Sequence, residues 1–375
     1  MRVGILLPGF SSSENDWAIP VQLNLVREMA KQDDVRVLAL RYPHHRDRYT
    51  VHGAEVCSLG VGQVRGLRRL ALWVDTLLTL RRLHRDRPFD VLHAMWADET
   101  GLIATWAGRW LGVPVVVSIA GGELVGFDDI NYGLQRSPFS RWIVGQALHG
   151  ADRVAAACTY AARLIPQAGY QLSPDKTRII TLGMDTTVFR PSERPISSKK
   201  LIHAASLVPV KDQATLLRAL ARLDESITLD IIGTGPQEPH LRSLAAELGI
   251  SQRVRFVGAV PHLETPAYYQ QAALNILCSR HEGLGMVTLE AAACGIPTVG
   301  TTVGLLPDHP ALGISVTVGD DAALASAVQL LLDDEQKRAA LGAAARNLVE
   351  EHFTIQETVR QFRALYAELV ANKSH

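Results

Sequence analysis

The first half of the chain alternates short apolar runs with longer stretches in which apolar residues recur at helical spacing. This alternation is typical of parallel strands joined by helices. Helices are predicted at residues 18–31, 67–85 and 99–111, and the last ends at Gly112, a common helix stop. Several strand runs are apolar throughout, so we expect helices on both faces of the sheet. The six predicted strands are residues 3–7, 35–40, 89–94, 113–119, 154–157 and 178–182.

A second series follows a polar segment, residues 189–200, whose prolines and serines predict a linker. Its predicted strands are residues 201–205, 227–233, 254–257, 274–278 and 297–299, and its helices are residues 213–223, 240–248 and 285–294. Residues 354–371 predict one more amphipathic helix, with Thr354 as its N-cap. The predicted organisation is therefore an α/β domain at residues 1–188, a linker at 189–200, a second α/β domain at 201–353, and a C-terminal helix at 354–375 that packs back toward the first domain.

Length, composition and charge agree with this organisation. A chain of 375 residues is longer than one hydrophobic core usually organises. Apolar residues make up 47% and charged residues 20%, which excludes disordered and fibrous classes. Lys plus Arg and Asp plus Glu number 38 each, so no net field favours nucleic acid as a partner.

Cysteine usage and hydropathy bear on location. The cysteines are scattered, with no C-x-x-C pair, so we expect no metal and a reducing compartment. The apolar stretch at the N-terminus is short for a signal peptide, and no window reaches the ~18 apolar residues that cross a bilayer. A cytoplasmic protein is therefore predicted. The four cysteines are Cys57, Cys158, Cys278 and Cys294.

The most informative motif is HEGLGMVTLE at residues 281–290, which follows a predicted strand and enters a helix near Gly285. Glycines let the backbone approach a ligand, and a helix N-terminus behind such a turn binds anions such as a diphosphate. The carboxylates of Glu282 and Glu290 accept hydrogen bonds from the paired hydroxyls of sugars and ribose. The alternative is an ordinary helix start with an incidental surface glutamate.

Two glutamates separated by seven residues in EGLGMVTLEA resemble the signature of the family 4 retaining glycosyltransferases, also called group 1 glycosyl transferases. The resemblance implies the GT-B fold, in which two Rossmann-like domains face each other across a cleft and a C-terminal helix crosses back. It implies that Glu282 contacts the donor sugar beside the reacting carbon and that Glu290 binds the ribose hydroxyls. The turn residues implied to contact the donor are Gly283, Leu284, Gly285 and Met286.

The segment AASLVPVK, residues 204–211, resembles the phosphate-binding segment of the same family. Lys211 matches the lysine that neutralises the diphosphate, and a solvated surface lysine is the alternative. Ser206 occupies the position where relatives usually carry an arginine. Either Ser206 donates a neutral hydrogen bond while another cation, with Arg280 as the candidate, compensates, or donor binding is weaker than in relatives.

Three further segments match the family in its order along the chain. LGMDTTVFRP at residues 182–191 resembles the passage from the first domain into the second. IIGTGP at residues 231–236 resembles the turn beside the nucleotide, and VGAV at residues 257–260 the segment against the base. The resemblance thus makes Gly233, Gly235 and Val257 donor-binding residues, although each segment alone is an ordinary turn or apolar run.

The first domain departs further from the family. Ala120, in SIAGGE, stands where many relatives carry a histidine linked to the reaction centre. Acceptor-side candidates are His93, at the end of a predicted strand, together with Gly121 and Glu123. A buried histidine with satisfied nitrogens is the alternative for His93. Exposed surface positions are the alternative for Glu123 and for Asp98, a weaker candidate.

Arginines flank an apolar stretch at residues 70–80, within the segment 65–87. A helix of this kind can lie on anionic lipid at the inner face of a membrane, which would suit a lipid-linked acceptor. The alternative is that its apolar face packs on the sheet and the arginines are solvated. The arginines are Arg65, Arg68, Arg69, Arg81, Arg82, Arg85 and Arg87.

The predicted function is retaining transfer of a hexosyl group from a nucleotide-diphosphate sugar to a sugar, lipid-linked or small-molecule acceptor. Lys211 and the amides at residues 284–286 would stabilise charge on the leaving diphosphate. The sequence has no D-x-D cluster, so metal-independent activity is expected, with no cofactor beyond the donor. UDP is the expected nucleotide by family frequency, with GDP and ADP as alternatives. The alternative functions are a sugar-nucleotide epimerase, a sugar phosphorylase, and a sugar-nucleotide-binding protein with weakened catalysis.

Overall fold

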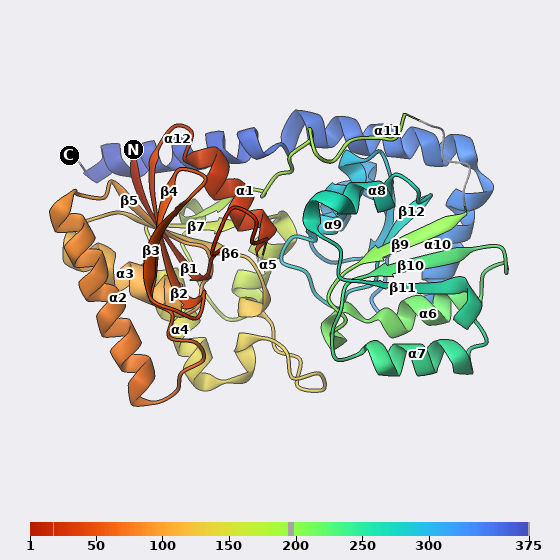
Figure 1. Cartoon of the computed structure of the whole chain (residues 1–375), viewed down its shortest axis with the longest axis horizontal. Coiled ribbons are helices and arrows are strands. Elements are labelled where there is room, and N and C mark those ends of the chain that lie inside the picture. Colours follow the sequence, from red (N-terminus) through yellow and green to blue (C-terminus); the bar gives the residue numbers. More distant parts are fainter. Residues whose placement is uncertain (18, 194–198, 374–375) are drawn as a thin grey trace. The chain divides into compact units, whose positions relative to one another are not determined.

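A computed structural model describes residues 1–17, 19–193 and 199–373. The chain divides into two compact units (Figure 1). Unit 1 comprises residues 1–182 and the C-terminal segment from Ile355, and unit 2 comprises residues 183–354. The predicted linker, residues 189–200, includes residues 194–198, which lie outside the described residues. Of the rest of that segment, Lys200 begins the first strand of unit 2.

Unit 1 has an eight-stranded sheet in the order β3-β4-β2-β1-β5-β6-β7-β8, parallel except for the β3–β4 pair. From β1 the chain moves outward to β2, and from β5 it moves the other way to β6. Right-handed crossovers therefore place α1 and α3 on opposite faces. The elements are β1 (Arg2–Gly9), α1 (Pro20–Met29), β2 (Asp34–Tyr42), β3 (Asp47–Val51), β4 (Ala54–Ser58), α2 (Leu67–Asp86), β5 (Val91–Ala94), α3 (Glu99–Leu111), β6 (Val115–Ile119), α4 (Pro138–Gly150), β7 (Arg153–Ala156), α5 (Thr159–Gln167), β8 (Thr177–Ile179) and α12 (Ile355–Lys373).

The six strands expected in this unit are present, and the β3–β4 hairpin is an addition to them. Its two-residue turn has positive φ at His52 (47°) and Gly53 (82°), as the tight hairpin turns require. The hairpin was missed because its strands are short and half-exposed, so they contain no apolar run. The turn dipeptide was the signal that could have predicted it.

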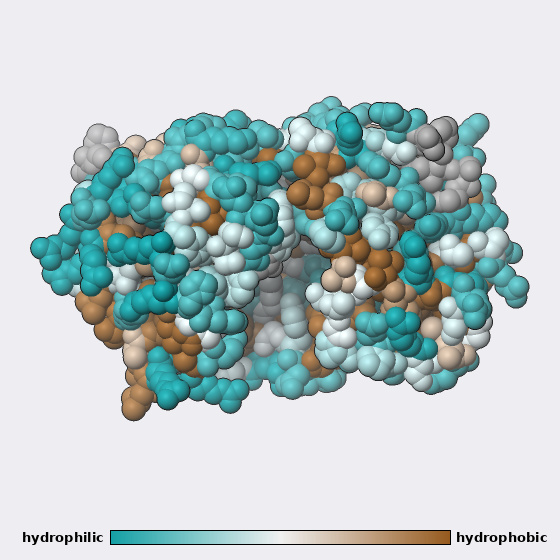
Figure 2. All heavy atoms as spheres, viewed as in Figure 1, coloured by the Kyte–Doolittle hydropathy of each residue, from teal (hydrophilic) through white to brown (hydrophobic). Residues whose placement is uncertain are grey.

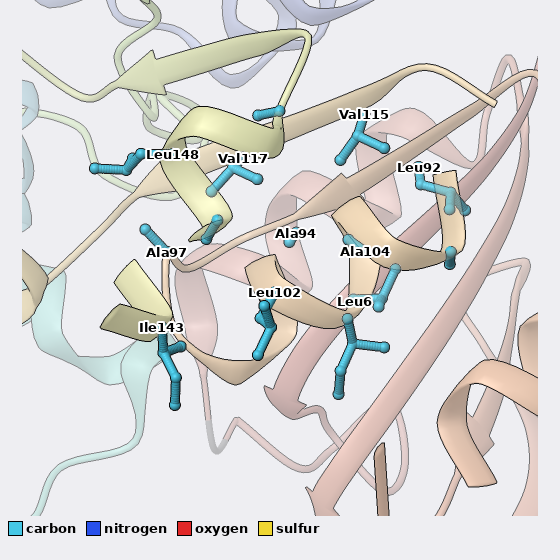
Figure 3. Close-up of a cluster of buried hydrophobic side chains, with 14 of the residues drawn as sticks. Leu6, Leu92, Ala94, Ala97, Leu102, Ala104, Val115, Val117, Ile143 and Leu148 are labelled. Atoms are coloured by element: carbon cyan, nitrogen blue, oxygen red, sulfur yellow. The ribbon is translucent and has the colours of Figure 1, made fainter. Parts of the chain in front are cut away.

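One hydrophobic core of unit 1 lies between the sheet and helices α2, α3 and α4 (Figure 3). The sequence sets the ends of α3: the Asp98 side chain accepts from Thr100 N at the start, and Gly112, with φ of 69°, ends it. Burial of each large aliphatic side chain contributes roughly 1.5–3 kcal/mol. Buried members of this core include Leu6, Leu92, Val115, Val117, Leu102, Ile143 and Leu148.

Helix α12 belongs to unit 1 although it follows unit 2 in the chain. It packs against α1 and β5, and Figure 1 shows it beside α1. Arg363 forms an ion pair with Asp33, with Nε and Oδ2 3.0 Å apart. Thr358 Oγ1 donates to the Thr181 carbonyl at 2.7 Å. These contacts hold the last helix of the chain on the first sheet.

Unit 2 has a fully parallel six-stranded sheet in the order β11-β10-β9-β12-β13-β14. Helices α6, α7 and α10 pack with the main hydrophobic core, whereas α9 packs with α11. Strand β14 and helices α8, α10 and α11 lie beyond the elements that the sequence predicted. The elements are β9 (Lys200–Ala204), α6 (Gln213–Ala221), β10 (Thr228–Ile232), α7 (Glu238–Glu247), β11 (Val254–Gly258), α8 (Thr265–Tyr269), β12 (Leu274–Leu277), α9 (Met286–Ala293), β13 (Thr298–Thr301), β14 (Gly313–Val316), α10 (Asp321–Asp333) and α11 (Glu335–His352).

Candidate active site

The order of strands in unit 2 determines where its ligand site should lie. From β9 the chain continues to β10 and β11 on one side, and from β12 it continues to β13 and β14 on the other. The neighbours β9 and β12 therefore form a topological switch point, where loops at the carboxyl ends of the strands diverge and leave room for a ligand. The loops concerned are residues 205–212 and 278–285.

Lys211 and Glu282, one from each loop, meet at this switch point. Lys211 Nζ lies 2.6 Å from Glu282 Oε1, and Ser279 Oγ donates to the same oxygen at 2.6 Å. The Lys211 side chain is 25% exposed and that of Glu282 11%, so the pair borders solvent without being immersed in it. Arg280 N donates to the Val210 carbonyl at 2.8 Å, which ties the two loops together.

Helix α9 begins at Met286, four residues after Glu282. Gly285 is the N-cap with φ of 83°, a conformation that glycine adopts at little cost. No described side chain caps this helix, and its first turn contains no acidic residue. An uncapped helix start carries partial positive charge and favours an anion. The turn of Gly283, Leu284 and Gly285 and the first helical residue, Met286, therefore have the electrostatics that a diphosphate requires.

Glu290 lies one turn further along α9 and is 8% exposed. Tyr269 donates its hydroxyl to Glu290 Oε2 at 2.9 Å. Burial raises the pKa of Glu290 to about 7, and the Tyr269 hydrogen bond opposes this rise. A carboxylate near its pKa at neutral pH gains from further donors, and ribose hydroxyls are donors of the required kind.

Gly233 and Gly235 form the turn that follows β10. Gly233, with φ of 122°, donates its N–H to the Gly258 carbonyl at 2.8 Å, next to Val257 at the end of β11. A Cβ at Gly235 would lie 2.4 Å from the Leu207 carbonyl oxygen, so this turn packs directly on the loop that follows β9. Gly233 and Gly235 are thus next to the Lys211 loop, and Val257 lies on the far side of β10, on the edge strand β11.

We expect Gly235→Ala to weaken nucleotide binding and to lower the free energy of unfolding by about 1–3 kcal/mol, because the Leu207 backbone must move. UDP titration and urea unfolding measure the two effects. Gly249→Ala is the matched control, since Gly249 has φ of 71° but open space around its Cβ position. The control should lose about 1 kcal/mol of stability and no affinity. Equal affinity loss in both variants would contradict the expectation.

Ser206 stands where relatives carry an arginine in the phosphate-binding segment, and Arg280 is the cation predicted to compensate for it. Ser206 is exposed, and its carbonyl accepts from Gln213 Nε2 at 3.1 Å. Arg280 is half-buried and follows Ser279 at the mouth of the same switch point. Compensation of Ser206 by Arg280 stays a prediction.

His203 is a residue of this site that the sequence reasoning missed. It is 1% exposed in β9, its Nδ1 lies 2.9 Å from the Ile276 carbonyl, and its Nε2 lies 3.3 Å from Gln213 Nε2. Burial lowers its pKa to about 4, so it is neutral at pH 7. His203 thus joins β9, β12 and the start of α6 beneath the Lys211 loop.

Gly304 is a second missed residue. A Cβ on it would lie 2.4 Å from the Leu284 carbonyl oxygen and 3.0 Å from Glu282 Cβ, and its φ is 64°. The next residue, Leu305, donates its N–H to the Leu284 carbonyl at 2.8 Å. Residues 304–305 therefore brace the Glu282 turn. A glycine after the β13 run was the only signal in the sequence.

In unit 1, Glu123 folds back onto its own loop. Its carboxylate accepts from Ala120 N at 3.1 Å and from Gly121 N at 2.7 Å. The residue is 2% exposed, so the alternative of an exposed surface carboxylate is wrong for Glu123. Burial raises its pKa to about 7, against the opposing effect of these hydrogen bonds. Asp98 has the separate role of capping α3.

His93 is fully buried at the end of β5. Its Nδ1 lies 2.6 Å from the Tyr366 hydroxyl and its Nε2 lies 2.8 Å from Ser118 Oγ. The Phe362 ring is 4.8 Å away, centre to centre, and burial lowers the pKa of His93 to about 3. Both ring nitrogens of His93 have protein partners. The structure therefore supports the buried, hydrogen-bonded alternative for His93 and not the acceptor-side prediction.

Comparison with known proteins decides the family. Residues 19–183 match the family described as "Glycosyl transferase 4-like domain", and residues 185–348 match "Glycosyl transferases group 1". D-inositol 3-phosphate glycosyltransferase 1 of Catenulispora acidiphila is 32% identical over 296 residues, which cover 71% of this chain and 69% of that protein. The chain belongs to the family 4, or group 1, glycosyltransferases.

Solved structures agree with the fold of this glycosyltransferase. Sucrose-phosphate synthase from Thermosynechococcus elongatus superposes with a TM-score of 0.82 at 20% identity, over 99% of both chains. Anabaena HepE in complex with UDP-glucose gives a TM-score of 0.74 at 20% identity, over 98% of this chain and all of that one. The GT-B fold, with two parallel-sheet α/β domains, is therefore confirmed.

For this glycosyltransferase we expect Glu282→Gln to separate binding from catalysis. Glu282 neutralises Lys211 in the free enzyme, so its removal should tighten UDP binding about fivefold. The contact to the donor sugar implied by the family would be lost, and kcat should fall about a hundredfold. UDP calorimetry and initial rates measure the two effects. Weaker UDP binding with unchanged kcat would show that Glu282 serves the nucleotide instead.

Proposed function

We propose that this glycosyltransferase moves a hexosyl group with retention from a UDP-sugar to a sugar, lipid-linked or small-molecule acceptor. The observation that carries the proposal is the Lys211–Glu282 pair, 2.6 Å apart at the switch point of unit 2, directly before the uncapped start of α9. A cation and a helix N-terminus face the leaving diphosphate, while a carboxylate is available to the sugar.

The reaction breaks the bond between the anomeric carbon and the diphosphate. Negative charge grows on the diphosphate, and Lys211 with the α9 amides would stabilise it where it forms. In the proposed mechanism the acceptor oxygen bonds to the anomeric carbon on the face that the diphosphate leaves, and the departing phosphate takes the proton of that hydroxyl, so the anomeric configuration is kept. Glu290 would hold the ribose, and Glu282 the donor sugar beside the reacting carbon.

The choice of UDP is supported by a relative of the same fold: HepE of Anabaena has been solved with UDP and with UDP-glucose. Acceptor candidates include a phosphorylated polyol, because the relative from Catenulispora is a D-inositol 3-phosphate glycosyltransferase. On the acceptor side we retain Gly121 and Glu123. Metal independence is part of the proposal.

The test uses the full chain with UDP-glucose labelled in the sugar, and acceptors that comprise D-inositol 3-phosphate, free sugars and lipid-linked sugars. We expect acceptor-dependent release of UDP, a product with the anomeric configuration of the donor, and rates unchanged by EDTA. Epimerised donor in the absence of acceptor would support the epimerase alternative. Donor binding without turnover across nucleotide sugars and acceptors would support the binding-protein alternative. Loss of activity in EDTA would overturn metal independence.

A further inference from the structure

Helix α2 of unit 1 has two apolar faces. One packs on the core through buried residues such as Leu72, Leu80 and Leu83. The other apolar face is exposed. Of the two alternatives that the sequence left for residues 65–87, each holds in part: the helix packs on the core of unit 1, and it also presents apolar side chains to solvent. We call these side chains the α2 stripe: Leu67, Leu70, Val74 and Leu78, which are 84%, 50%, 55% and 50% exposed.

The stripe is continuous along the helix. Its members are separated by three, four and four residues, which places them on one side of an α-helix. A helix on the surface of a globular protein ordinarily carries polar residues there. Figure 2 shows hydrophobic residues gathered over α2, at the lower left of the view. Such a patch marks an interaction site.

Exposed aromatic side chains on the neighbouring helices extend the stripe. Trp110 of α3 is 50% exposed, and the guanidinium of Arg81 on α2 lies 4.8 Å from its ring centre. Phe139 and Trp142 of α4 are each 45% exposed, and their rings stack 6.0 Å apart. Phe139 also stacks on Trp73 of α2 at 6.5 Å. We call the stripe with these three exposed aromatics the α2–α4 surface.

This surface holds most of the exposed apolar bulk of the protein. Of the described residues, twelve large hydrophobic side chains are exposed, and seven of the twelve lie on the α2–α4 surface. Such a concentration is not expected of apolar residues scattered over a globular surface. We therefore expect the α2–α4 surface to bind a partner.

The charges around the surface favour an anionic occupant. Exposed arginines continue the stripe at its C-terminal end, where a surface hollow is lined by Leu78, by the three arginines Arg81, Arg82 and Arg85, and by one acid, Asp86. Arg82 also lines a second cavity of about 650 Å³, whose charged lining is three arginines and two acids: Arg46, Arg48, Arg82, Asp47 and Asp75. Asp75, an acidic residue of α2, is paired with Arg46 at 2.6 Å.

We infer that the α2–α4 surface docks on the face of an anionic lipid bilayer. Leucine side chains enter the boundary between headgroups and acyl chains, aromatic rings lie at headgroup level, and arginines pair with lipid phosphates. No described helix is both long enough and apolar enough to cross a bilayer, so the contact is peripheral. A symmetric contact between two copies is disfavoured, because it would bring the same arginines together.

The test is flotation of the full chain with two kinds of vesicle: phosphatidylcholine alone, and an equal mixture of phosphatidylcholine and phosphatidylglycerol. We expect binding to the mixed vesicles that weakens as salt is raised, since surface charges are screened. Leu70→Ser with Leu78→Ser should reduce that binding on the order of tenfold. Arg81→Glu with Arg85→Glu should reduce it by about tenfold or more, and more at low salt.

Matched controls use residues of the same kind elsewhere. Leu263 and Leu330 are 52% and 48% exposed in unit 2, so Leu263→Ser with Leu330→Ser matches the leucine pair in exposure. Arg163→Glu, on α5, is the charge control. UDP affinity and melting temperature, which these substitutions should leave unchanged, report the folded state.

Three outcomes would overturn the inference. The first is failure of the unaltered protein to bind the mixed vesicles. The second is equal loss of binding in the α2 variants and the controls. The third is self-association by sedimentation that the leucine pair abolishes, in the absence of vesicle binding, which would make the surface an interface between copies. None of these readouts requires sugar transfer, so the docking inference and the proposed function fail separately.

Discussion

Lys211→Ala is expected to lower kcat/KM for sugar transfer on the order of a thousandfold, a loss of about 4 kcal/mol in transition-state stabilisation. Lys211 Nζ is the ammonium that meets Glu282 at the switch point of unit 2. Charge on the leaving diphosphate is largest in the transition state, so most of the loss should appear in kcat. Initial rates at varied UDP-sugar concentration make the measurement.

Part of that loss has a second cause. Removing Lys211 leaves the Glu282 carboxylate, 11% exposed, without its ion-pair partner and next to an incoming diphosphate. The double variant Lys211→Ala with Glu282→Gln removes this repulsion. It should recover UDP affinity relative to Lys211→Ala alone and should not recover kcat.

Lys200→Ala is the matched control for Lys211. Lys200 begins the same strand, β9, at its opposite end, and lies 3.8 Å from Asp230. Its loss should leave kcat/KM within about twofold, because surface ion pairs contribute little. Lys211→Ala with activity close to that of Lys200→Ala would remove Lys211 from the mechanism.

The sequence predicted well those elements whose burial follows from a local run of apolar residues. Strands such as β6 and β12 are apolar at nearly every position because helices cover both faces of their sheets. The motif at residues 281–290 was also readable, since its glycines and carboxylates are adjacent in the chain. A local pattern was enough to predict a fold and one side of a site.

What the sequence could not predict depends on contacts between distant residues. His203 contacts Gln213 and Ile276, and Gly304 packs against Leu284. No local sequence pattern predicts these contacts. His93 looked equally suited to a site and to a core until its partner Tyr366, 273 residues away, was known. For α2 the sequence left a lipid-facing helix and a core-packed helix as alternatives, because both apolar faces contribute to one periodic pattern.

The affinity for UDP-glucose is expected to rise about tenfold between pH 6 and pH 8. Burial raises the pKa of Glu290 to about 7, so the free enzyme carries mostly the carboxylic acid at pH 6 and mostly the carboxylate at pH 8. Ribose hydroxyls donate to the ionised form, and binding near pH 7 should release protons. The diphosphate of UDP-glucose has no group that titrates near neutrality. Calorimetry in buffers of different ionisation enthalpy measures affinity and proton release together.

The same shift makes the stability of the free enzyme depend on pH with the opposite sign. A folded pKa above the unfolded value stabilises the protein at low pH, and this contribution is lost as the pH rises through about 7. Melting temperature should therefore fall with pH in the absence of ligand, while UDP-glucose affinity rises. Glu290→Gln should flatten the pH dependence of affinity and reduce that of stability, to which Glu123, whose pKa burial also raises to about 7, still contributes.

Two substitutions at this position decide whether Glu290 is the titrating group. Glu290→Gln should bind UDP-glucose about a hundredfold more weakly at pH 8, since hydrogen bonds to a carboxylate are replaced by bonds to a neutral amide. Tyr269→Phe removes the hydroxyl that donates at 2.9 Å and opposes the raised pKa, so the affinity midpoint should move up by about one pH unit. Proton release that persists in Glu290→Gln would assign the titration to another group. It would also contradict the proposed hydrogen bonds between Glu290 and the ribose hydroxyls.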